Sequence, residues 1–196
     1  MLDFSEHHIP LCIQNIFGNK NECVLEIGFG DGDFLIEMAE RNPEKNYLGI
    51  EIKTKRFKTA LNNSRDFKYD NLRFMHMNAS IAVEEIFTSD SFSLVYINFP
   101  DPWPKDRHHK HRIVNKDFLN SLSRIMKNGG VLEIASDHRD YISQCFEVFD
   151  RIGFYSSQYP EPGYLHNLPN RPQTKYEKGF RKEGREIFYL MFTNNK

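Results

Sequence analysis

The chain has 196 residues, of which 39% are hydrophobic and 27% are charged, and its formal net charge at pH 7 is −1. This length allows a large hydrophobic core, and the composition excludes an intrinsically disordered chain. The near-neutral charge excludes a protein that covers nucleic acid with its whole surface, so any site for a polyanion must be local.

No apolar run approaches the roughly 18–20 residues that a membrane span needs, and residues 1–6 lack the cationic and apolar regions of a signal peptide. The three cysteines, Cys12, Cys23 and Cys145, are odd in number and widely spaced. This pattern favours buried thiols in a reducing compartment over disulfides or a metal site. We therefore expect a cytoplasmic protein that does not bind to membranes.

The first predicted strand, residues 23–27, leads into a glycine-rich turn and a helix over residues 34–39. The next patterns predict, in chain order, a strand at 47–52, a helix at 53–61, a strand at 72–77, a helix at 81–87 and a strand at 92–97. They are followed by a helix at 118–126 that is closed by Asn128-Gly-Gly130, a strand at 131–135 and a helix at 141–149. The last part contains a proline-rich stretch at 160–172 and a strand at 187–192. Strands that alternate with helices through short links predict an α/β fold with a mostly parallel, doubly wound sheet. We expect residues 1–196 to form one domain, with a short N-terminal segment at 1–21.

Acidic or amide side chains follow the predicted strands at or near their carboxyl ends. These residues are Glu26, Glu51, Asn78, Asp101 and Asp137. Open α/β sheets bind ligands beyond the carboxyl ends of their strands. The sequence therefore predicts a binding site at this edge of the sheet.

The segment Glu26-Ile-Gly-Phe-Gly-Asp-Gly32 joins the first strand to the first helix, and Gly28 and Gly30 allow a ligand to approach its backbone closely. A carboxylate directly before the glycines repels a pyrophosphate but attracts an ammonium group. Glu51, at the end of the second strand, is placed to accept hydrogen bonds from ribose hydroxyls. S-adenosyl-L-methionine has the ammonium group and the ribose but no phosphate, so these residues favour it over NAD. A plain strand–helix turn is the alternative.

Asn78 follows the third strand. Its amide can accept from the adenine amino group and donate to a ring nitrogen, or it can serve only to shape the turn. Both interpretations stay open on the sequence.

The loop from Asn98 to Arg112 follows the fourth strand and contains three prolines, the single tryptophan and a dense basic stretch. Prolines stiffen a loop and lower the entropy cost of holding one shape. A fixed carboxylate, Asp101, beside a flat aromatic ring and a row of cations is suited to a nucleobase in a nucleic acid. Trp103 is placed either to stack on that base or to anchor the loop.

Two stretches are locally basic. Residues 101–112 contain four lysines and arginines and three histidines, and residues 171–185 contain six lysines and arginines. They predict two patches that contact nucleic-acid phosphates, although such runs are also typical of solvated loops. The cations that flank His108, His109 and His111 disfavour a metal site, so we expect no metal.

Three segments together resemble the bacterial tRNA (guanine-N7-)-methyltransferase family. They are Leu25-Glu-Ile-Gly-Phe-Gly-Asp-Gly32, Phe99-Pro-Asp-Pro-Trp-Pro-Lys-Asp-Arg-His-His-Lys-His-Arg112 and Thr174-Lys-Tyr-Glu177. Their order and spacing match as well, so the resemblance extends from about Cys23 to the end of the chain. The middle segment is highly specific, whereas the glycine segment is general among S-adenosyl-L-methionine enzymes.

The resemblance implies a Rossmann-like class I methyltransferase fold with an antiparallel C-terminal strand. It implies methyl transfer from S-adenosyl-L-methionine to N7 of the variable-loop guanine, position 46, of tRNA. The sequence itself requires no partner protein, and we expect a monomer or a homodimer. Under the resemblance, Glu26, Gly28, Gly30, Glu51 and Asn78 hold the cofactor. Asp101 is the catalytic carboxylate beside both cofactor and base, and the tRNA contacts are Lys105, Asp137, Thr174, Lys175, Tyr176 and Glu177.

Guanine N7 carries a lone pair, so attack on a sulfonium methyl needs no general base, and catalysis depends on alignment and electrostatics. Two alternatives remain. One is an adenine-N6 amino methyltransferase, whose Asn/Asp-Pro-Pro-aromatic loop is loosely similar to the segment at Asn98. The other is a non-catalytic subunit that binds S-adenosyl-L-methionine or RNA.

Overall fold

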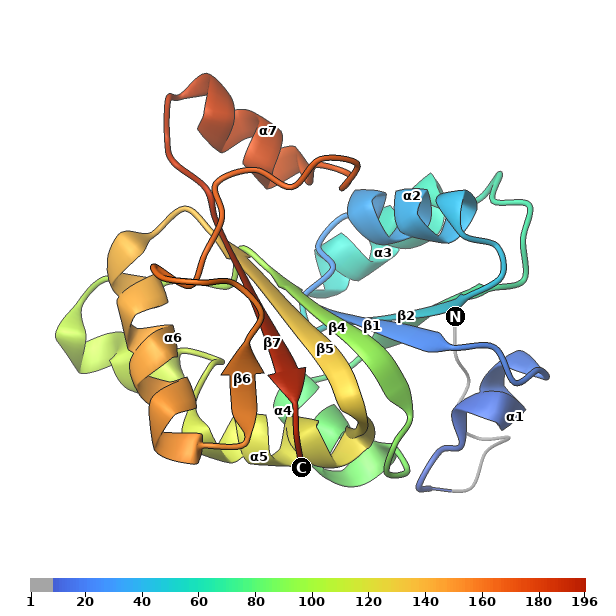
Figure 1. Cartoon of the computed structure of the whole chain (residues 1–196). Helices are drawn as coiled ribbons and strands as arrows, with labels where there is room; N and C mark the ends of the chain where they lie inside the picture. Colours follow the sequence, from blue (N-terminus) through green and yellow to red (C-terminus); the bar gives the residue numbers. More distant parts are fainter. Residues whose placement is uncertain (1–8) are drawn as a thin grey trace.

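The structure is a computed structural model that describes residues 9–196. Its centre is one seven-stranded sheet in the order β3-β2-β1-β4-β5-β7-β6 (Figure 1). The strands are β1 (Cys23–Ile27), β2 (Asn46–Glu51), β3 (Leu72–His76), β4 (Phe92–Asn98), β5 (Met126–Ser136), β6 (Tyr155–Ser157) and β7 (Phe188–Asn194). The helices are α1 (Ile13–Phe17), α2 (Asp33–Arg41), α3 (Thr54–Asn63), α4 (Ala79–Ile81), α5 (Lys116–Ile125), α6 (Arg139–Ile152) and α7 (Lys175–Lys182).

The first five strands run parallel, since β1 pairs with β2 and β4, β2 with β3, and β4 with β5 in that direction. The last strand, β7, pairs antiparallel with both β5 and β6. This arrangement confirms the predicted α/β fold, its mostly parallel sheet and its antiparallel C-terminal strand. The three-residue strand β6 was not predicted, because it is too short and too exposed to form an apolar run.

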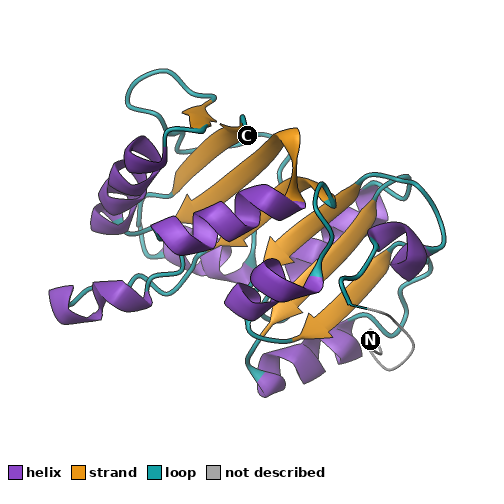
Figure 2. Cartoon of the chain, turned by 90° about the horizontal axis from the view of Figure 1, so that it is seen from below, coloured by secondary structure: helices purple, strands orange, loops and turns teal. Residues whose placement is uncertain are grey.

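Helices cover both faces of the sheet (Figure 2). Val24 of β1 belongs to the core layer that α2 and α3 cover, whereas its neighbour Leu25 belongs to the layer that α5 and α6 cover. Successive side chains of a strand point to opposite faces, so a strand buried on both faces is mostly apolar. This burial explains why the parallel strands were recognisable as continuous apolar runs.

The predicted end of the helix at 118–126 is wrong. The helix ends at Ile125, and β5 begins at once with Met126, five residues before the predicted strand start at Val131. Gly129 has a φ of 76°, and the register between β4 and β5 shifts between Phe92 and Leu94. The glycines therefore form an irregularity inside β5 and do not stop the helix, because pairing with β4 prevails over the local signal.

Two helical segments also differ from the predictions. The segment predicted at 81–87 is a single α-turn, Ala79–Ile81, that continues as a π-helical turn over Ala82–Ile86. The helix α7 follows the proline-rich stretch, where no helix was predicted. Among residues 9–196, no helix combines the length and the apolar character that crossing a bilayer requires.

The N-terminal segment predicted at 1–21 is described only from residue 9 onward, and residues 1–8 lie outside the described part. Within it, α1 packs Ile13, Ile16 and Phe17 into the larger of the core clusters. The assignment of residues 1–196 to a single domain stays a prediction.

Candidate functional site

The glycine loop between β1 and α2 opens the carboxyl edge of the sheet. Gly28 and Gly30 have φ values of 75° and 60°, a region that side chains disfavour. A Cβ added at Gly28 would meet no atom within 4 Å, and one at Gly30 would meet only the ring of Tyr176 at 4.0 Å. The loop therefore presents bare backbone to open space, as close approach by a ligand requires.

Glu26 lies beneath this loop and is only 1% exposed. Its Oε1 accepts a hydrogen bond from Asn98 Nδ2 at 2.8 Å, whereas its Oε2 is buried and has no partner among the described residues. Burial raises the pKa of Glu26 to about 7, an effect that Asn98 and Arg171 oppose. A buried carboxylate oxygen without a partner is costly unless a donor arrives. The site therefore fits the ammonium group of S-adenosyl-L-methionine.

Glu51 is buried at the end of β2 and fastens two turns. Its Oε2 accepts from the amide of Gly30 at 3.0 Å, and its Oε1 accepts from the amide of Lys53 at 2.7 Å. Each carboxylate oxygen can accept a second hydrogen bond. The residue thus fixes the shape of the glycine loop and still has acceptors to offer a ribose, a role that stays a prediction.

Asn78 caps the N-terminus of α4. Its side-chain oxygen accepts from the amides of Ser80 and Ile81, at 2.8 and 3.4 Å, so the turn role left open by the sequence is present. Its exposed NH₂ group can still donate to an adenine ring nitrogen. The expected acceptance from the adenine amino group is less favourable, because the oxygen already has two donors.

The loop after β4 holds Asp101 at the same edge. The Asp101 side chain is 68% exposed, and its Oδ2 lies 3.7 Å from Lys53 Nζ, at the end of the second strand. Phe99 and Trp103 have positive φ values of 50° and 43°, so the backbone on both sides of Asp101 is strained. Since β4 pairs directly with β1, this carboxylate and Glu26 extend from neighbouring strand ends.

Arg112 anchors the loop from inside, which corrects its assignment to the phosphate-contacting patch. It is 2% exposed, and its Nε donates to the Pro102 carbonyl at 2.8 Å. Its guanidinium also lies 5.3 Å from the ring centre of Tyr141. The cations of this patch that face solvent are Lys105, Arg107 and Lys110.

Trp103 is 36% exposed, and its ring packs against those of His108 and His111, at centroid distances of 5.7 and 5.2 Å. The indole is thus partly fixed by the loop itself and partly open. Both roles considered for it, stacking and anchoring, remain compatible with this position.

The segment Thr174–Glu177 forms the start of α7 and lies against the glycine loop. Lys175 Nζ is 2.9 Å from Asp33, and Arg56 donates to the hydroxyl of Tyr176 at 2.6 Å. Both side chains are largely exposed, at 60% for Lys175 and 46% for Tyr176. They are therefore positioned to meet a substrate that covers this edge, although a direct contact stays a prediction.

Glu177 and Thr174 do not face the surface, which corrects their prediction as tRNA contacts. Thr174 Oγ1 caps α7 by accepting from the amide of Glu177 at 3.0 Å. The carboxylate of Glu177 is fully buried, where it accepts from Arg181 at 2.9 Å and from the Tyr189 hydroxyl at 2.5 Å. Thr174 thus begins α7, and Glu177 fixes α7 to Tyr189 of β7.

Asp137 follows β5, and its side chain is 9% exposed and forms an ion pair with Arg185. The guanidinium of Arg185 in turn lies 4.4 Å from the ring centre of Phe180 in α7. The structure thus gives Asp137 a partner within the chain, and contact with tRNA would require that pair to open.

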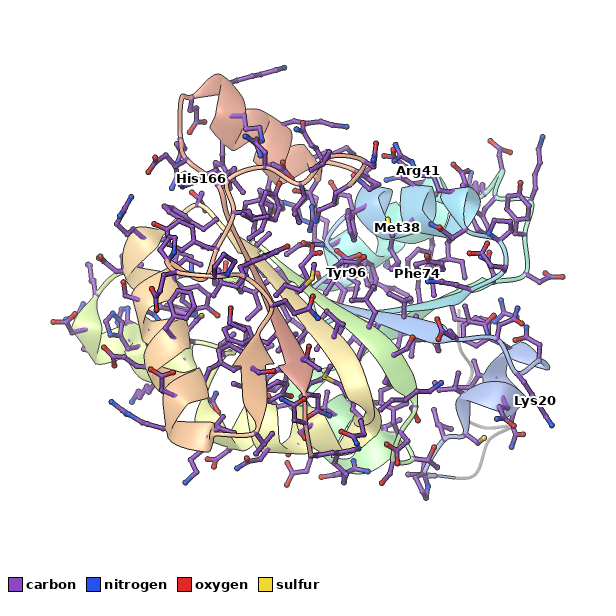
Figure 3. The ribbon with its side chains drawn as sticks, viewed as in Figure 1. Lys20, Met38, Arg41, Phe74, Tyr96 and His166 are labelled. Carbon is purple, nitrogen blue, oxygen red and sulfur yellow. The ribbon has the colours of Figure 1, made fainter. Side chains whose placement is uncertain are left out.

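A buried polar network behind the site was missed by the sequence interpretation. It contains Asn98, Glu133, Arg171, Glu177 and Tyr189. Tyr96 lies beside it, in the layer between the sheet and α2 that also contains Phe74 and Met38 (Figure 3). A signal did exist, since Glu133 is a charged residue inside an apolar strand, and such a residue needs a buried partner.

The comparisons with known proteins agree with this architecture. A family model described as "Putative methyltransferase" matches residues 20–190. Curated proteins named tRNA (guanine-N(7)-)-methyltransferase are similar: that of Thermotoga maritima is 34% identical over 93% of this chain and 57% of its own length. The protein of Syntrophotalea carbinolica is 37% identical over 95% and 80%, and that of Shewanella denitrificans is 38% identical over 97% and 79%.

The chain thus spans little more than half the length of the first of these relatives and about four fifths of the other two. Among solved structures, the 16S rRNA methyltransferase KamB superposes with a TM-score of 0.68 at 13% identity, covering 93% of this chain and 92% of that one. An antibiotic-related methyltransferase superposes with a TM-score of 0.64 at 15% identity, covering 97% of both chains. These structural matches confirm the predicted class I methyltransferase fold.

Proposed function

The chain belongs to the tRNA (guanine-N(7)-)-methyltransferase family, and we propose that it transfers a methyl group from S-adenosyl-L-methionine to N7 of the variable-loop guanine, position 46, of tRNA. The observation that carries the proposal is the pairing of β1 with β4. This pairing places two loops at the same edge of the sheet: the glycine loop, which covers Glu26, and the strained loop that contains Asp101. Identifying the methylated nucleoside after reaction with tRNA tests the proposal.

The cofactor half of the site is assigned to residues of the first three strand ends. Glu26 meets the ammonium group with its unpartnered oxygen, Glu51 meets the ribose, and Asn78 meets the adenine. Gly28 and Gly30 provide the space for close approach. When bound, S-adenosyl-L-methionine supplies an electrophilic methyl group on a sulfonium.

The catalytic half centres on Asp101. Guanine needs no deprotonation at N7, but the ring gains positive charge as the new bond forms. A carboxylate held by a strained, proline-stiffened loop stabilises this charge and accepts hydrogen bonds from the guanine N1–H and amino group. Lys53 Nζ lies 3.7 Å from the Asp101 carboxylate, but this exposed pair restrains it only weakly, so the backbone of the loop must position it.

The tRNA half comprises the exposed cations of the loop after β4, together with Lys175 and Tyr176 on α7. A tRNA substrate and three free cysteines favour the cytoplasm as the location. Activity requires no other protein, and the enzyme is a monomer or a homodimer of this chain.

Glu51→Ala is expected to weaken the affinity for S-adenosylhomocysteine by about 10- to 100-fold, because it removes charged hydrogen bonds to the ribose and to the Gly30 amide. Calorimetry measures the change. Glu22→Ala is the control, since Glu22 is an exposed acid that pairs with Lys45 and precedes β1, at the opposite edge of the sheet. Equal affinity in the Glu51→Ala variant and the wild type would remove the ribose role.

Lys105→Ala is expected to raise the KM for tRNA and to flatten the slope of log affinity against log salt concentration by about 0.7–0.9, the loss of one phosphate contact. Lys105 has no ion pair within residues 9–196, so its charge is available. Lys20→Ala is the matched control, because Lys20 is exposed at the far edge of the sheet (Figure 3). Identical slopes in both variants would exclude a phosphate contact at position 105.

A further inference from the structure

Arg171 is the centre of the buried network behind the site. Its side chain is 7% exposed. Its Nε donates to Glu133 Oε1 at 2.5 Å, its Nη1 lies 3.4 Å from Glu177 Oε2, and its Nη2 donates to Asn98 Oδ1. The guanidinium carbon also lies 4.6 Å from the ring centre of Phe34. Every edge of the guanidinium thus has a partner.

The contact with Asn98 extends this network to the cofactor site. An asparagine amide has an acceptor oxygen on one side and a donor NH₂ on the other. Because Arg171 donates to the oxygen, the NH₂ group must point the other way, where it donates to Glu26 at 2.8 Å. Without the guanidinium, the Asn98 oxygen loses its donor, and only the hydrogen bond to Glu26 holds the amide in this orientation.

We infer that Arg171 is a positioning residue for the cofactor site: through the Asn98 amide it holds the Glu26 carboxylate charged and aimed at the cofactor's ammonium group. Arg171 immediately precedes the Pro-Gln-Thr segment that enters α7 and bonds to Glu177 of that helix. The packing of α7 against the sheet and the affinity of the site for the ammonium group are therefore coupled. The inference rests on the proposed function, because it concerns the same cofactor.

The charges around Glu26 support the direction of the effect. The groups that act on it are the Asn98 amide of β4, Arg171 before α7, Glu51 of β2 and Asp33 of α2. Together they leave the pKa of Glu26 at about 7: burial raises it most, the two carboxylates also raise it, and Asn98 and Arg171 lower it. Loss of the arginine charge therefore moves the pKa of Glu26 upward, so that less of the carboxylate is ionised near neutral pH.

The test is the binding of S-adenosylhomocysteine between pH 6.0 and 7.5, measured by calorimetry on the full chain. In the wild type, affinity rises with pH through about pH 7, the pKa of Glu26, and levels off above it. If Arg171→Gln raises that pKa by about one unit, the variant binds about tenfold more weakly at pH 6.0 but only about threefold more weakly at pH 7.5. An affinity ratio that is constant over this range, or equal to one, would overturn the inference.

A matched control distinguishes an effect on Glu26 from a general loosening of the packing of α7. Arg181 donates to the same Glu177 carboxylate at 2.9 Å but does not touch Asn98. Arg181→Gln should lower the melting temperature while leaving the pH profile of binding in place. If it shifts the profile as Arg171→Gln does, the effect belongs to the helix as a whole and the inference fails.

A double-mutant cycle tests directly whether Arg171 acts through the charge of Glu26. In a Glu26→Gln background, where there is no charge to hold, Arg171→Gln should cause little further loss of affinity. A full additional loss would contradict the inference. If Arg171→Gln does not fold, Asn98→Ala breaks the same connection between Arg171 and Glu26. It should shift the pH profile of S-adenosylhomocysteine binding in the same direction, and an unshifted profile would contradict the inference. No binding by the wild type at any pH would instead refute the proposed function.

Discussion

Replacing Asp101 by alanine is expected to lower the rate of methyl transfer to tRNA by about 100- to 1,000-fold, the usual effect of removing one preorganised group that stabilises transition-state charge. The reason is the positive charge that the guanine ring acquires as N7 is alkylated. Affinity for S-adenosylhomocysteine should stay within about threefold, because Glu26 and Glu51 hold the cofactor on neighbouring strands.

The matched control for Asp101→Ala is Asp106→Ala. Asp106 lies in the same loop, but its side chain is fully exposed and is 3.6 Å from His109. Single-turnover rates for both variants with the same tRNA give the comparison. Transfer by Asp101→Ala within threefold of wild type would remove Asp101 from the catalytic centre, as would an equal loss in the control.

Replacing Glu26 by glutamine is expected to stabilise the ligand-free protein and to impair cofactor binding. In the folded wild type the pKa of Glu26 rises from 4.5 to about 7, so ionising it costs stability as pH rises through this interval, and the full cost is present above pH 7. Glutamine has no proton to lose. The free energy of unfolding should therefore increase by about 1–3 kcal/mol at pH 8, and the gain should fall below about 1 kcal/mol at pH 5.

The same variant should bind S-adenosylhomocysteine at least about 100-fold more weakly, because removing one partner of a buried ion pair typically costs about 3–5 kcal/mol. Urea unfolding at pH 5 and pH 8, paired with calorimetry, measures both effects. A variant that is less stable than wild type at pH 8, or that binds the ligand equally well, would contradict the assignment of Glu26 to the ammonium group.

The features that could be predicted from the sequence share one physical cause. The parallel strands are largely buried, so each contains a mostly apolar run, and the glycine loop follows directly from the end of β1. Glu26, Glu51 and Asp101 could be placed at one edge because each lies at or just beyond the end of such a strand. Parallel strands bring these ends together whatever the details of packing.

The features that were missed depend on partners far away in the sequence. Arg112 and Arg171 lie in basic stretches that are typical of solvated loops. Both are nevertheless buried, because they contact aromatic rings and donate to buried acceptors. The helix α7 has few apolar residues, but Thr174 followed by Glu177 has the spacing of a helix N-cap. That spacing was interpreted as a substrate contact, and the structure uses it to begin the helix.

The identity of the methylated base decides whether the protein transfers a methyl group to guanine N7 of tRNA. The protein is incubated with S-adenosyl-L-methionine and an unmodified tRNA transcript, the RNA is digested to nucleosides, and the products are identified by mass spectrometry. We expect 7-methylguanosine, which should disappear when a matched transcript carries adenine in place of the variable-loop guanine. Formation of N6-methyladenosine, or no methylated nucleoside from a protein that binds S-adenosylhomocysteine, would contradict this expectation.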